Sequence, residues 1–541
     1  MSDKDGIVGA ASIMGSATML SRVLGYIRDA VIAYIFGASV PADAFFVAFR
    51  ISNLFRRLVG EGALTSSFIP IFTELITVRS KEELRAFVLR FFLLFSCILI
   101  VLATLGVFFA PWLVRVMAPG FVDVAGKFAL TVTLTRFMFP YVVFIGLMAI
   151  AMGILNSYRH FTAPALSPVL FNITIIFMSL VVSPFMESPI YALAIGVVIG
   201  GFFQFVLQLP FLGKYGMIPR SFALKTTTST SSTGIGSSVD KPVARILLLM
   251  GPALLGIGVY QLNIFVTLRF ASHLPQGSIS YLYYAGRLME LPLGVFGVAI
   301  AQAVLPSLSS HVVNSDMVSF KSSLSFALRL VNFVNIPAMV GLFVLSIPII
   351  DLLFVRGEFS TNDGIMTSYA LYFYALGIVP VAASRIVVAV FYSLKDTKTP
   401  LVGALITFAV NIVLCFLLVG PMAHGGLALA TSISSLVNLV FLGVMLRRRL
   451  GGFELVSIFS SGLKSSVAAL LMGIVIYLGL SWLPWEQLQL AFKALALIVV
   501  IGVGVVVYMG FSYILKVPEQ AFLKTMLWEK LAGKGTKKSA K

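Results

Sequence analysis

Charged side chains occur inside segments that are otherwise apolar enough to cross a membrane as helices. Residues 18–37 read TMLSRVLGYIRDAVIAYIFG and include Arg22, Arg28 and Asp29. On the insertion scale, three ionic residues at mid-bilayer cost about 8 to 10 kcal/mol, whereas each Leu, Ile, Val or Phe contributes only about 0.3 to 0.6 kcal/mol. We therefore expect these side chains to avoid lipid, with Arg22 and Asp29 on one stripe of the helix.

The next apolar segment, ADAFFVAFRISNLFRRLVGEGALTSSFIP at residues 42–70, places four charged residues on one face of a helix. Their spacings of 7, 7 and 4 residues keep them within about 40° of one another. They are Asp43, Arg50, Arg57 and Glu61. Asn53 lies near this face, whereas Arg56 points elsewhere on a straight helix.

A third apolar segment, SYLYYAGRLMELPLGVFGVA at residues 280–299, carries Arg287 and Glu290 one helical turn apart. One interpretation is that all these charges form internal salt bridges. The charge balance favours another, because six arginines accompany four carboxylates: Arg22, Arg28, Arg50, Arg56, Arg57 and Arg287 against Asp29, Asp43, Glu61 and Glu290. Such a surplus needs an anion or abundant water, and Arg suits bidentate recognition of phosphate or carboxylate. The sequence therefore favours a phosphate-bearing ligand in a cavity lined by these three segments.

The composition of the whole chain indicates a polytopic helical membrane protein. Of its 541 residues, 59% are hydrophobic and 11% charged, whereas soluble domains average about 25% charged residues. The mean hydropathy is +1.02. Apolar runs long enough to cross about 30 Å of hydrocarbon recur along the chain. They predict fourteen membrane-spanning helices, near 8–37, 42–76, 86–118, 128–155, 162–183, 189–212, 243–272, 279–309, 322–347, 364–394, 399–419, 424–446, 459–482 and 488–515.

The placement of the net charge of +18 predicts the topology. If both termini are cytoplasmic, most basic residues fall in inner loops and tails, including the triplet at 447–449 and seven lysines from 516 to 541. The outer loops then hold only Lys127, Arg356 and Lys493. This asymmetry is the positive-inside rule, so the basic residues indicate orientation in a membrane and not binding of nucleic acid.

Motifs for nucleotide, metal or hydrolytic chemistry are missing from the sequence. It contains no Walker A loop, no GxGxxG on a strand and no GxSxG. Cys97 and Cys415 lie in separate predicted spans, and the four histidines are scattered without metal-ligand spacing. We therefore expect no metal, cofactor or nucleotide. No cleavable signal peptide is expected either, because MSDKDG is polar and the first apolar segment is too long.

A repeat divides the chain. Prolines of the two halves match in order at offsets of 234 to 240 residues, beginning with Pro41 and Pro275. Two six-helix halves of the same orientation typically enclose a cavity and alternate its access; the simpler alternative is a bundle whose duplication is only ancestral. The predicted divisions are an N-terminal lobe at 1–224, a flexible linker at 225–242, a C-terminal lobe at 243–450, an extra helix pair at 451–516 and a basic tail at 517–541.

Several of these segments resemble the MurJ/MviN lipid II flippases of bacteria. The resemblance covers the segments above, beginning with SRVLGYIRDAVIAYIFGA, together with APGF at 118–121 and FYSLKDTKTP at 391–400. It implies a fourteen-span transporter, and not an enzyme, of the multidrug/oligosaccharidyl-lipid/polysaccharide exporter superfamily in the bacterial cytoplasmic (inner) membrane. Its substrate would be lipid II, an undecaprenyl-pyrophosphate-linked disaccharide-pentapeptide, moved from the inner to the outer leaflet for peptidoglycan synthesis.

The resemblance also implies roles for individual residues. The arginines that hold the pyrophosphate in the family match Arg22, Arg28, Arg56 and Arg287, and an acidic residue matches Asp43. The extra helix pair would hold the polyprenyl tail. The remaining charged and amide side chains would support the cavity: Asp29, Arg50, Asn53, Arg57, Glu61 and Glu290. Helical spacing places Arg57 on the polar face, whereas the resemblance assigns the pyrophosphate-binding role to Arg56. A second difference is Gly286, which stands where close relatives carry Asp.

Two other functions remain as alternatives. An exporter of drugs or of another polyprenyl-linked oligosaccharide would share the fold, although cationic drugs need acidic cavities. A membrane-embedded glycosyltransferase would need a catalytic carboxylate at the outer face, for which the loop 347–363 offers Asp351, Glu358 and Asp363. Coupling to the membrane potential or to an ion also stays open. The polar groups that either serve an ion or bond neighbouring helices are Asn263, Asn411 and Asp396.

Overall fold

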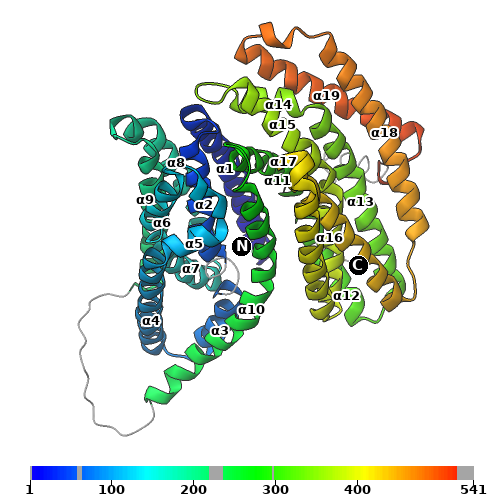
Figure 1. Cartoon of the computed structure of the whole chain (residues 1–541). Helices are drawn as coiled ribbons and strands as arrows, with labels where there is room; N and C mark the ends of the chain where they lie inside the picture. The colour runs from blue at the N-terminus through cyan, green and yellow to red at the C-terminus, as the bar shows by residue number, and fades with distance from the viewer. Residues whose placement is uncertain (1–2, 58–63, 219–234, 295–297, 521–541) are drawn as a thin grey trace. The chain divides into compact units, whose positions relative to one another are not determined.

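The computed structural model describes residues 3–57, 64–218, 235–294 and 298–520, and within these ranges the regular structure is helical without a strand (Figure 1). The chain divides into two compact units. The first unit comprises Met1–Ser280 with Gly357–Phe359, and the second comprises Tyr281–Arg356 with Ser360–Lys541.

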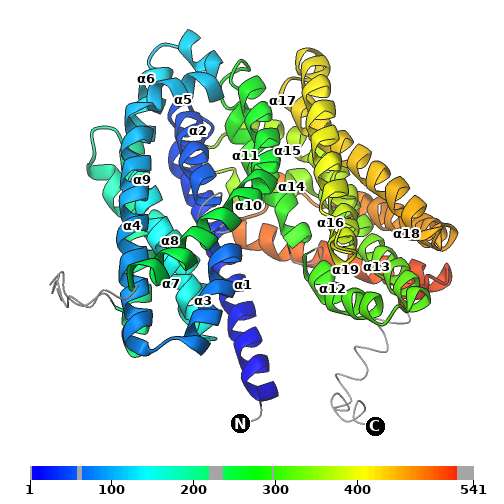
Figure 2. The same cartoon turned by 90° about the horizontal axis from the view of Figure 1, so that it is seen from below.

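The first unit is built from ten α-helices in its described part. Their bounds are α1 Asp3–Phe36, α2 Val40–Phe55, α3 Leu64–Val78, α4 Lys81–Phe108, α5 Ala110–Met117, α6 Lys127–Met138, α7 Tyr141–Ser157, α8 Thr162–Phe177, α9 Ile190–Lys214 and α10 Ile235–Ala271. Helix α9 packs against α7 and α8, and α8 also packs against α1 (Figure 2). Helix α2 packs on α6, and α10 packs on α3 and α5. These contacts fix the surroundings of α2, which carries most of the charged residues of interest.

The second unit contains the rest of the described helices. Their bounds are α11 Ser278–Pro292, α12 Val298–Val313, α13 Met317–Val344, α14 Ser346–Phe354, α15 Thr361–Leu376, α16 Ile378–Ser393, α17 Lys398–Leu450, α18 Leu455–Ser481 and α19 Leu490–Ile514. Helices α13, α18 and α19 share a buried apolar cluster that includes Phe333, Met472 and Tyr508. The Tyr508 hydroxyl donates to the Phe333 carbonyl at 2.7 Å, which satisfies the polar group of that side chain.

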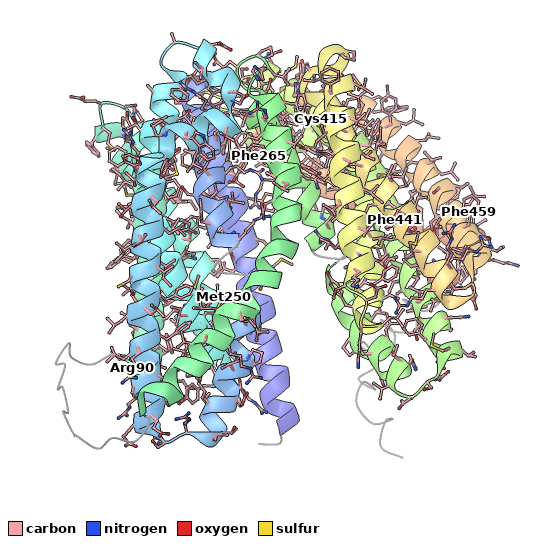
Figure 3. The ribbon with its side chains drawn as sticks, turned by 60° about the horizontal axis from the view of Figure 1, so that its bottom comes forward. Arg90, Met250, Phe265, Cys415, Phe441 and Phe459 are labelled. Carbon is pink, nitrogen blue, oxygen red and sulfur yellow. The ribbon has the colours of Figure 1, made fainter. Side chains whose placement is uncertain are left out.

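Helix α17 is a hairpin of two helical limbs. Ala423 has non-helical angles, φ 47° and ψ −131°, two residues after Pro421. A Cβ on Gly426 would lie 2.3 Å from the Leu418 carbonyl oxygen, and one on Gly403 would lie 3.3 Å from Phe441 (Figure 3). The limbs therefore run antiparallel and correspond to the predicted spans 399–419 and 424–446.

The described helices confirm a membrane-type, all-helical fold. Eight of them are long and apolar enough to cross a membrane, or nine if Thr361–Leu376 and Ile378–Ser393, bent by 40°, form one span. The count of fourteen spans and the cytoplasmic termini stay predictions. Several predicted spans are broken helices within the described residues, such as 86–118, which the structure describes as α4 and α5.

The predicted linker differs from the structure in its second part. Residues 225–234 lie outside the described residues, whereas residues 235–242 form the first turns of α10. Their Ser and Gly content indicated a flexible segment. Extending an existing helix adds one hydrogen bond per residue without the cost of nucleation, so a weakly helical sequence can continue a long helix. The duplication and the lobe boundaries remain predictions.

Two glycines of the first unit allow a close backbone contact at the end of α1. Gly37 and Gly357 have positive φ angles of 57° and 60°. A Cβ on Gly37 would lie 2.3 Å from the Glu358 carbonyl oxygen, and one on Gly357 would lie 2.3 Å from the Tyr34 carbonyl oxygen. The Glu358 N–H donates to that Tyr34 oxygen at 2.9 Å. A side chain at either glycine would force these backbones apart.

We expect Gly37→Ala to destabilise the first unit more than Gly126→Ala. Gly126 also has a positive φ, 73°, but an added Cβ there would have no atom within 4 Å. Both substitutions carry the cost of about 1 to 2 kcal/mol for a left-handed non-glycine residue, and only Gly37→Ala adds the steric clash. Thermal unfolding of the purified protein in detergent measures both; equal losses of apparent Tm would contradict the close contact.

Candidate functional site

The candidate site is built on α2, whose start is specified by local sequence. The Ser39 hydroxyl accepts a hydrogen bond from the Ala42 N–H at 3.4 Å, and Pro41 and Asp43 lie in the first turn. Ser at the N-cap, Pro at the first positions and an acidic residue in the first turn all favour a helix start. The helix ends at Phe55, and residues 56–57 continue it in a wider π-type turn. Its last turns therefore present basic and amide side chains.

Those side chains line a pocket within the first unit. Its cavity volume is about 30 Å³, which is room for one or two water molecules. Helix α2 contributes Arg50, Asn53 and Arg57, and the opposite wall comes from α5 and α10, with Met117, Gln261 and Phe265 among its residues. Phe265 projects from α10 in Figure 3. The pocket fits an oxygen of an anionic group and not a whole sugar.

The charge of this pocket is positive. Arg50 and Arg57 are partly buried, and neither forms a hydrogen bond or ion pair with another described residue. Gln261 is buried at 8% exposure and is uncharged. Because the lining holds two guanidinium groups and no carboxylate, it can bind an anion by charge-assisted hydrogen bonds.

Arg56 lies outside this lining although it is the next residue to Arg57. Its Nε donates to the Asn53 side-chain oxygen. The lining by Arg50, Asn53 and Arg57 has the spacing that the helical period predicts for one face. Glu61, which was predicted on the same face, lies outside the described residues.

Arg28 forms the internal salt bridge that was the alternative interpretation of its charge. Its Nη2 and Nε donate to Asp29 Oδ1 at 2.6 and 3.0 Å, and its Nη1 donates to Asn172 Oδ1 at 3.1 Å. Asn172 on α8 donates in turn to the Ser21 carbonyl at 3.0 Å. Arg28 and Asp29 are buried, whereas Arg22 on the same helix is partly buried and has no hydrogen-bond partner among the described residues.

Arg287 and Glu290 belong to the second unit and form an ion pair, as the alternative interpretation by internal salt bridges expects. The Arg287 Nη1 donates to Glu290 Oε2 at 3.0 Å, and their side chains are 29% and 56% exposed. Gly286 beside them has open space around its Cα, with no atom within 4 Å of an added Cβ. A larger residue at 286 would therefore fit without a clash.

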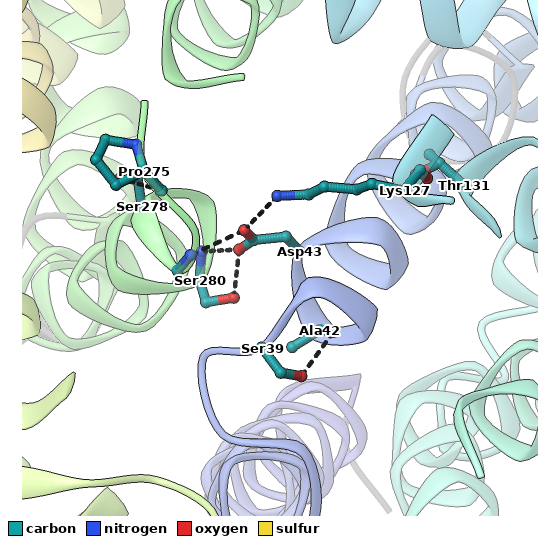
Figure 4. A network of polar contacts seen from close by, with 9 residues as sticks. Ser39, Ala42, Asp43, Lys127, Thr131, Pro275, Ser278 and Ser280 are labelled. Atoms are coloured by element: carbon teal, nitrogen blue, oxygen red, sulfur yellow. Dashed lines mark hydrogen bonds and ion pairs between the residues drawn. The ribbon is translucent and has the colours of Figure 1, made fainter. Parts of the chain in front are cut away.

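Asp43 occupies a different environment from the one predicted for a ligand-binding residue. It is 1% exposed, and both carboxylate oxygens are saturated (Figure 4). Oδ2 accepts from Lys127 Nζ at 2.8 Å and from the Gly277 N–H at 2.9 Å. Oδ1 accepts from the Ser280 N–H at 3.1 Å and from its hydroxyl at 2.7 Å. Asp43 therefore joins α2 to α6 and to the start of α11.

Lys127, which is predicted to lie in an outer loop, has its side chain buried against other residues of the first unit. It is the first residue of α6, is 3% exposed, and places its ammonium 4.1 Å from the centre of the Phe121 ring. Lys127 and Asn172 are the polar partners of Asp43 and Arg28 that the sequence did not predict, and Gln261 is a lining residue that it did not predict. The sequence feature that could have identified them is a single amide or ammonium group inside an otherwise apolar helix.

We expect Asp43→Asn to destabilise the first unit by about 3 to 5 kcal/mol, because the substitution leaves the Lys127 ammonium buried without a counter-charge. Adding Lys127→Met should recover part of the loss. The exposed Asp123 serves as the control, since Asp123→Asn should change stability by less than about 0.5 kcal/mol. Denaturant unfolding of the solubilised wild type and these variants measures the differences; no recovery in the double variant would argue against a coupled pair.

Comparison with known proteins identifies close relatives over nearly the whole chain. Residues 32–497 match a family model described as Lipid II flippase MurJ. A Vibrio cholerae protein named probable lipid II flippase MurJ is 36% identical and covers 93% of this chain and 95% of its own length. A Burkholderia cenocepacia protein named lipid II flippase MurJ is 35% identical and covers 92% of this chain and 96% of its own.

Solved structures agree with these relatives. A structure described as lipid II flippase MurJ in an inward closed conformation has a TM-score of 0.76 at 30% identity, over 93% of this chain and 98% of its own. An inward-facing multidrug resistance MATE family transporter of the MOP superfamily has a TM-score of 0.64 at 14% identity, over 82% of this chain and 98% of its own. The second likeness concerns the fold alone.

Proposed function

The chain belongs to the lipid II flippase MurJ family, and from this premise we propose that it moves lipid II from the inner to the outer leaflet of the bacterial cytoplasmic membrane by alternating access. The observation that carries the proposal is the family match over residues 32–497 in a chain whose charged pocket is basic. The protein is a transporter in the peptidoglycan pathway and not an enzyme.

The pyrophosphate is the part of this substrate that an arginine surplus recognises. We assign Arg22, Arg28, Arg56 and Arg287 to holding it, with Arg50 and Arg57 adding positive charge at the pocket of α2. Arg28 keeps its orientation through Asp29 and Asn172. Asp43 then acts through structure, because its hydrogen bonds position the start of α2. The polyprenyl tail is assigned to α18 and α19.

Outward movement of this head group requires no nucleotide. The cytoplasmic side of an energised bacterial membrane is the negative side, and each negative charge carried outward gains about 2.3 kcal/mol per 100 mV. We propose the membrane potential as a driving force. An ion remains a further candidate, with Asn263 and Asn411 as buried polar groups; Asp396 instead accepts from the Lys398 and Thr399 N–H groups at 3.0 Å each.

The structure favours transport over the alternative of a glycosyltransferase. Asp351 accepts hydrogen bonds from Trp485 Nε1 at 2.9 Å and Lys493 Nζ at 2.8 Å. Asp363 caps α15 and accepts from the Tyr281 hydroxyl at 2.7 Å. Two of the three candidate carboxylates are therefore occupied by structural contacts. The arginine surplus counts against a cationic-drug exporter.

We expect Arg287→Ala to abolish lipid II translocation while the protein still inserts, because the substitution removes a guanidinium that the pyrophosphate needs. The control is Arg90→Ala, which removes an exposed arginine on α4 (Figure 3). Complementation of a flippase-depleted strain and translocation of labelled lipid II in proteoliposomes measure both. Normal complementation by Arg287→Ala would refute the assignment, and polymerisation of lipid II by the wild type would favour the glycosyltransferase.

The pocket of α2 makes a separate prediction. Replacing both Arg50 and Arg57 by Gln should weaken lipid II binding about a hundredfold or more, since each charge-assisted hydrogen bond contributes roughly 1.5 to 3 kcal/mol. Arg115→Gln is the matched control, because Arg115 is exposed on α5 and does not line the pocket. Binding by the double variant at wild-type strength would place the pyrophosphate elsewhere.

A further inference from the structure

A second pocket lies within the second unit, where α17 ends and α18 begins. Its cavity volume is about 590 Å³, within the range of about 300 to 1,000 Å³ that ligand pockets span. Arg447 of the last turn of α17 lines it, together with the connection through Gly452 and Phe453 and the first turns of α18. The pocket is remote in sequence from the α2 pocket and contains none of the residues assigned to the pyrophosphate.

The lining carries one basic and one acidic side chain. The Arg447 side chain is exposed and has no hydrogen bond or ion pair with another described residue. Glu454 is 58% exposed and lies 3.8 Å from Arg329, whose Nε pairs at 2.9 Å with the buried Glu519. Arg329 therefore faces two carboxylates, and Glu454, the more distant of them, also lines the pocket. The lining offers sites for both a negative and a positive group of one ligand.

Neighbouring charges are neutralised by other contacts. Arg449, two residues after Arg447, pairs with Asp396. The Thr399 backbone N–H is the main cause that holds the pKa of Asp396 below its usual value, so this carboxylate is ionised at neutral pH. Of the basic triplet, Arg447 is the residue that lines the pocket. Arg448 is exposed and does not line it.

Two serine hydroxyl groups line the pocket together with Arg447. Arg329 Nη1 donates to Ser457 Oγ at 2.5 Å, and the Glu519 carboxylate, 1% exposed, accepts from the Ser461 hydroxyl at 2.6 Å. A serine hydroxyl that already accepts a hydrogen bond still has its own proton to donate. Ser457 and Ser460 both line the pocket and can donate to phosphate oxygens next to Arg447.

An apolar stripe leads away from the pocket along α18. Val456, which lines the pocket, is 84% exposed, and Phe459 and Leu463 are 75% and 57% exposed. Their spacing of three and four residues puts them on one face, which continues through Val467 and Leu470. Phe459 lies on the outer side of α18 in Figure 3. An exposed apolar stripe on a membrane-type helix is suited to acyl chains.

We propose that this pocket binds an aminophospholipid of the surrounding membrane, with its phosphate on Arg447 and Ser457, its ammonium on Glu454 and its acyl chains along the α18 stripe. The ligand is a zwitterionic glycerophospholipid and not the transported substrate, although the polyprenyl tail is assigned to the same helix, α18. The site goes beyond lipid II translocation and does not depend on it. Anionic phospholipid would meet Arg447 equally well but would find the Glu454 carboxylate repulsive.

The test measures binding of phosphatidylethanolamine and phosphatidylglycerol, each labelled on an acyl chain, to the full-length protein in detergent. Arg447→Ala should weaken binding of both lipids about tenfold, the loss expected for one charge-assisted hydrogen bond. Glu454→Gln should weaken phosphatidylethanolamine alone. Arg448→Ala, which removes the neighbouring charge, should leave both affinities unchanged. All three residues are exposed, so we expect the variants to fold, which size-exclusion profiles check.

Four results would overturn the proposal. Equal losses of lipid affinity for Arg447→Ala and Arg448→Ala would show that the lipid is attracted by the charge of the basic triplet in general and not bound at this pocket. Tighter binding of phosphatidylglycerol by the wild type, or unchanged phosphatidylethanolamine binding by Glu454→Gln, would remove the role of Glu454. Displacement of the labelled lipid by undecaprenyl phosphate would assign the pocket to the substrate tail. Lipid II translocation is measured in parallel and can fail without affecting these readouts.

Discussion

The buried pair of Asp43 and Lys127 is the constraint on which the arrangement around α2 depends. A carboxylate and an ammonium taken out of water are tolerated only if nearly all their hydrogen-bonding capacity is met. The protein meets it with Gly277 and Ser280, so α2, α6 and the segment entering α11 must be in register at once. The position of Arg50 two turns further along α2 follows from this anchor, because a helix that is fixed at its start presents its later residues at fixed angles.

The arginines divide by what neutralises them. Arg28 is matched by Asp29 within one helix, and Arg287 by Glu290, whereas the described surroundings of Arg50 and Arg57 contain an uncharged Gln261 instead. In the proposed function, the matched arginines hold a fixed geometry for the pyrophosphate and add little net charge. The unmatched arginines supply the electrostatic attraction to it. A transporter that must release its cargo benefits from having both kinds, since a cavity of unmatched cations alone would bind a pyrophosphate too tightly to let it go.

Helical periodicity alone predicted which residues of α2 share a face, and the lining by Arg50, Asn53 and Arg57 agrees with it. The membrane-type fold was equally accessible from composition. The partners of the charged residues were not, because a period describes angles within one helix and not which helix packs on it. Lys127 was assigned to an outer loop from its place in the chain. Its burial beside Asp43 depends on the packing of α2 on α6, which the sequence does not show. Likewise, composition indicated a flexible linker up to residue 242. In the structure, residues 235–242 are helical because they form the first turns of α10.

The hairpin of α17 has a consequence for how the protein is made. Its two limbs meet at Pro421 and Ala423 without an intervening loop, while basic residues stand at both outer ends, at Lys398 and at the triplet 447–449. One limb is not expected to cross the membrane while the other stays in water, because the turn that joins them is too short. The limbs are therefore expected to enter the bilayer together, uncharged tip first, with both basic ends retained on the side of synthesis.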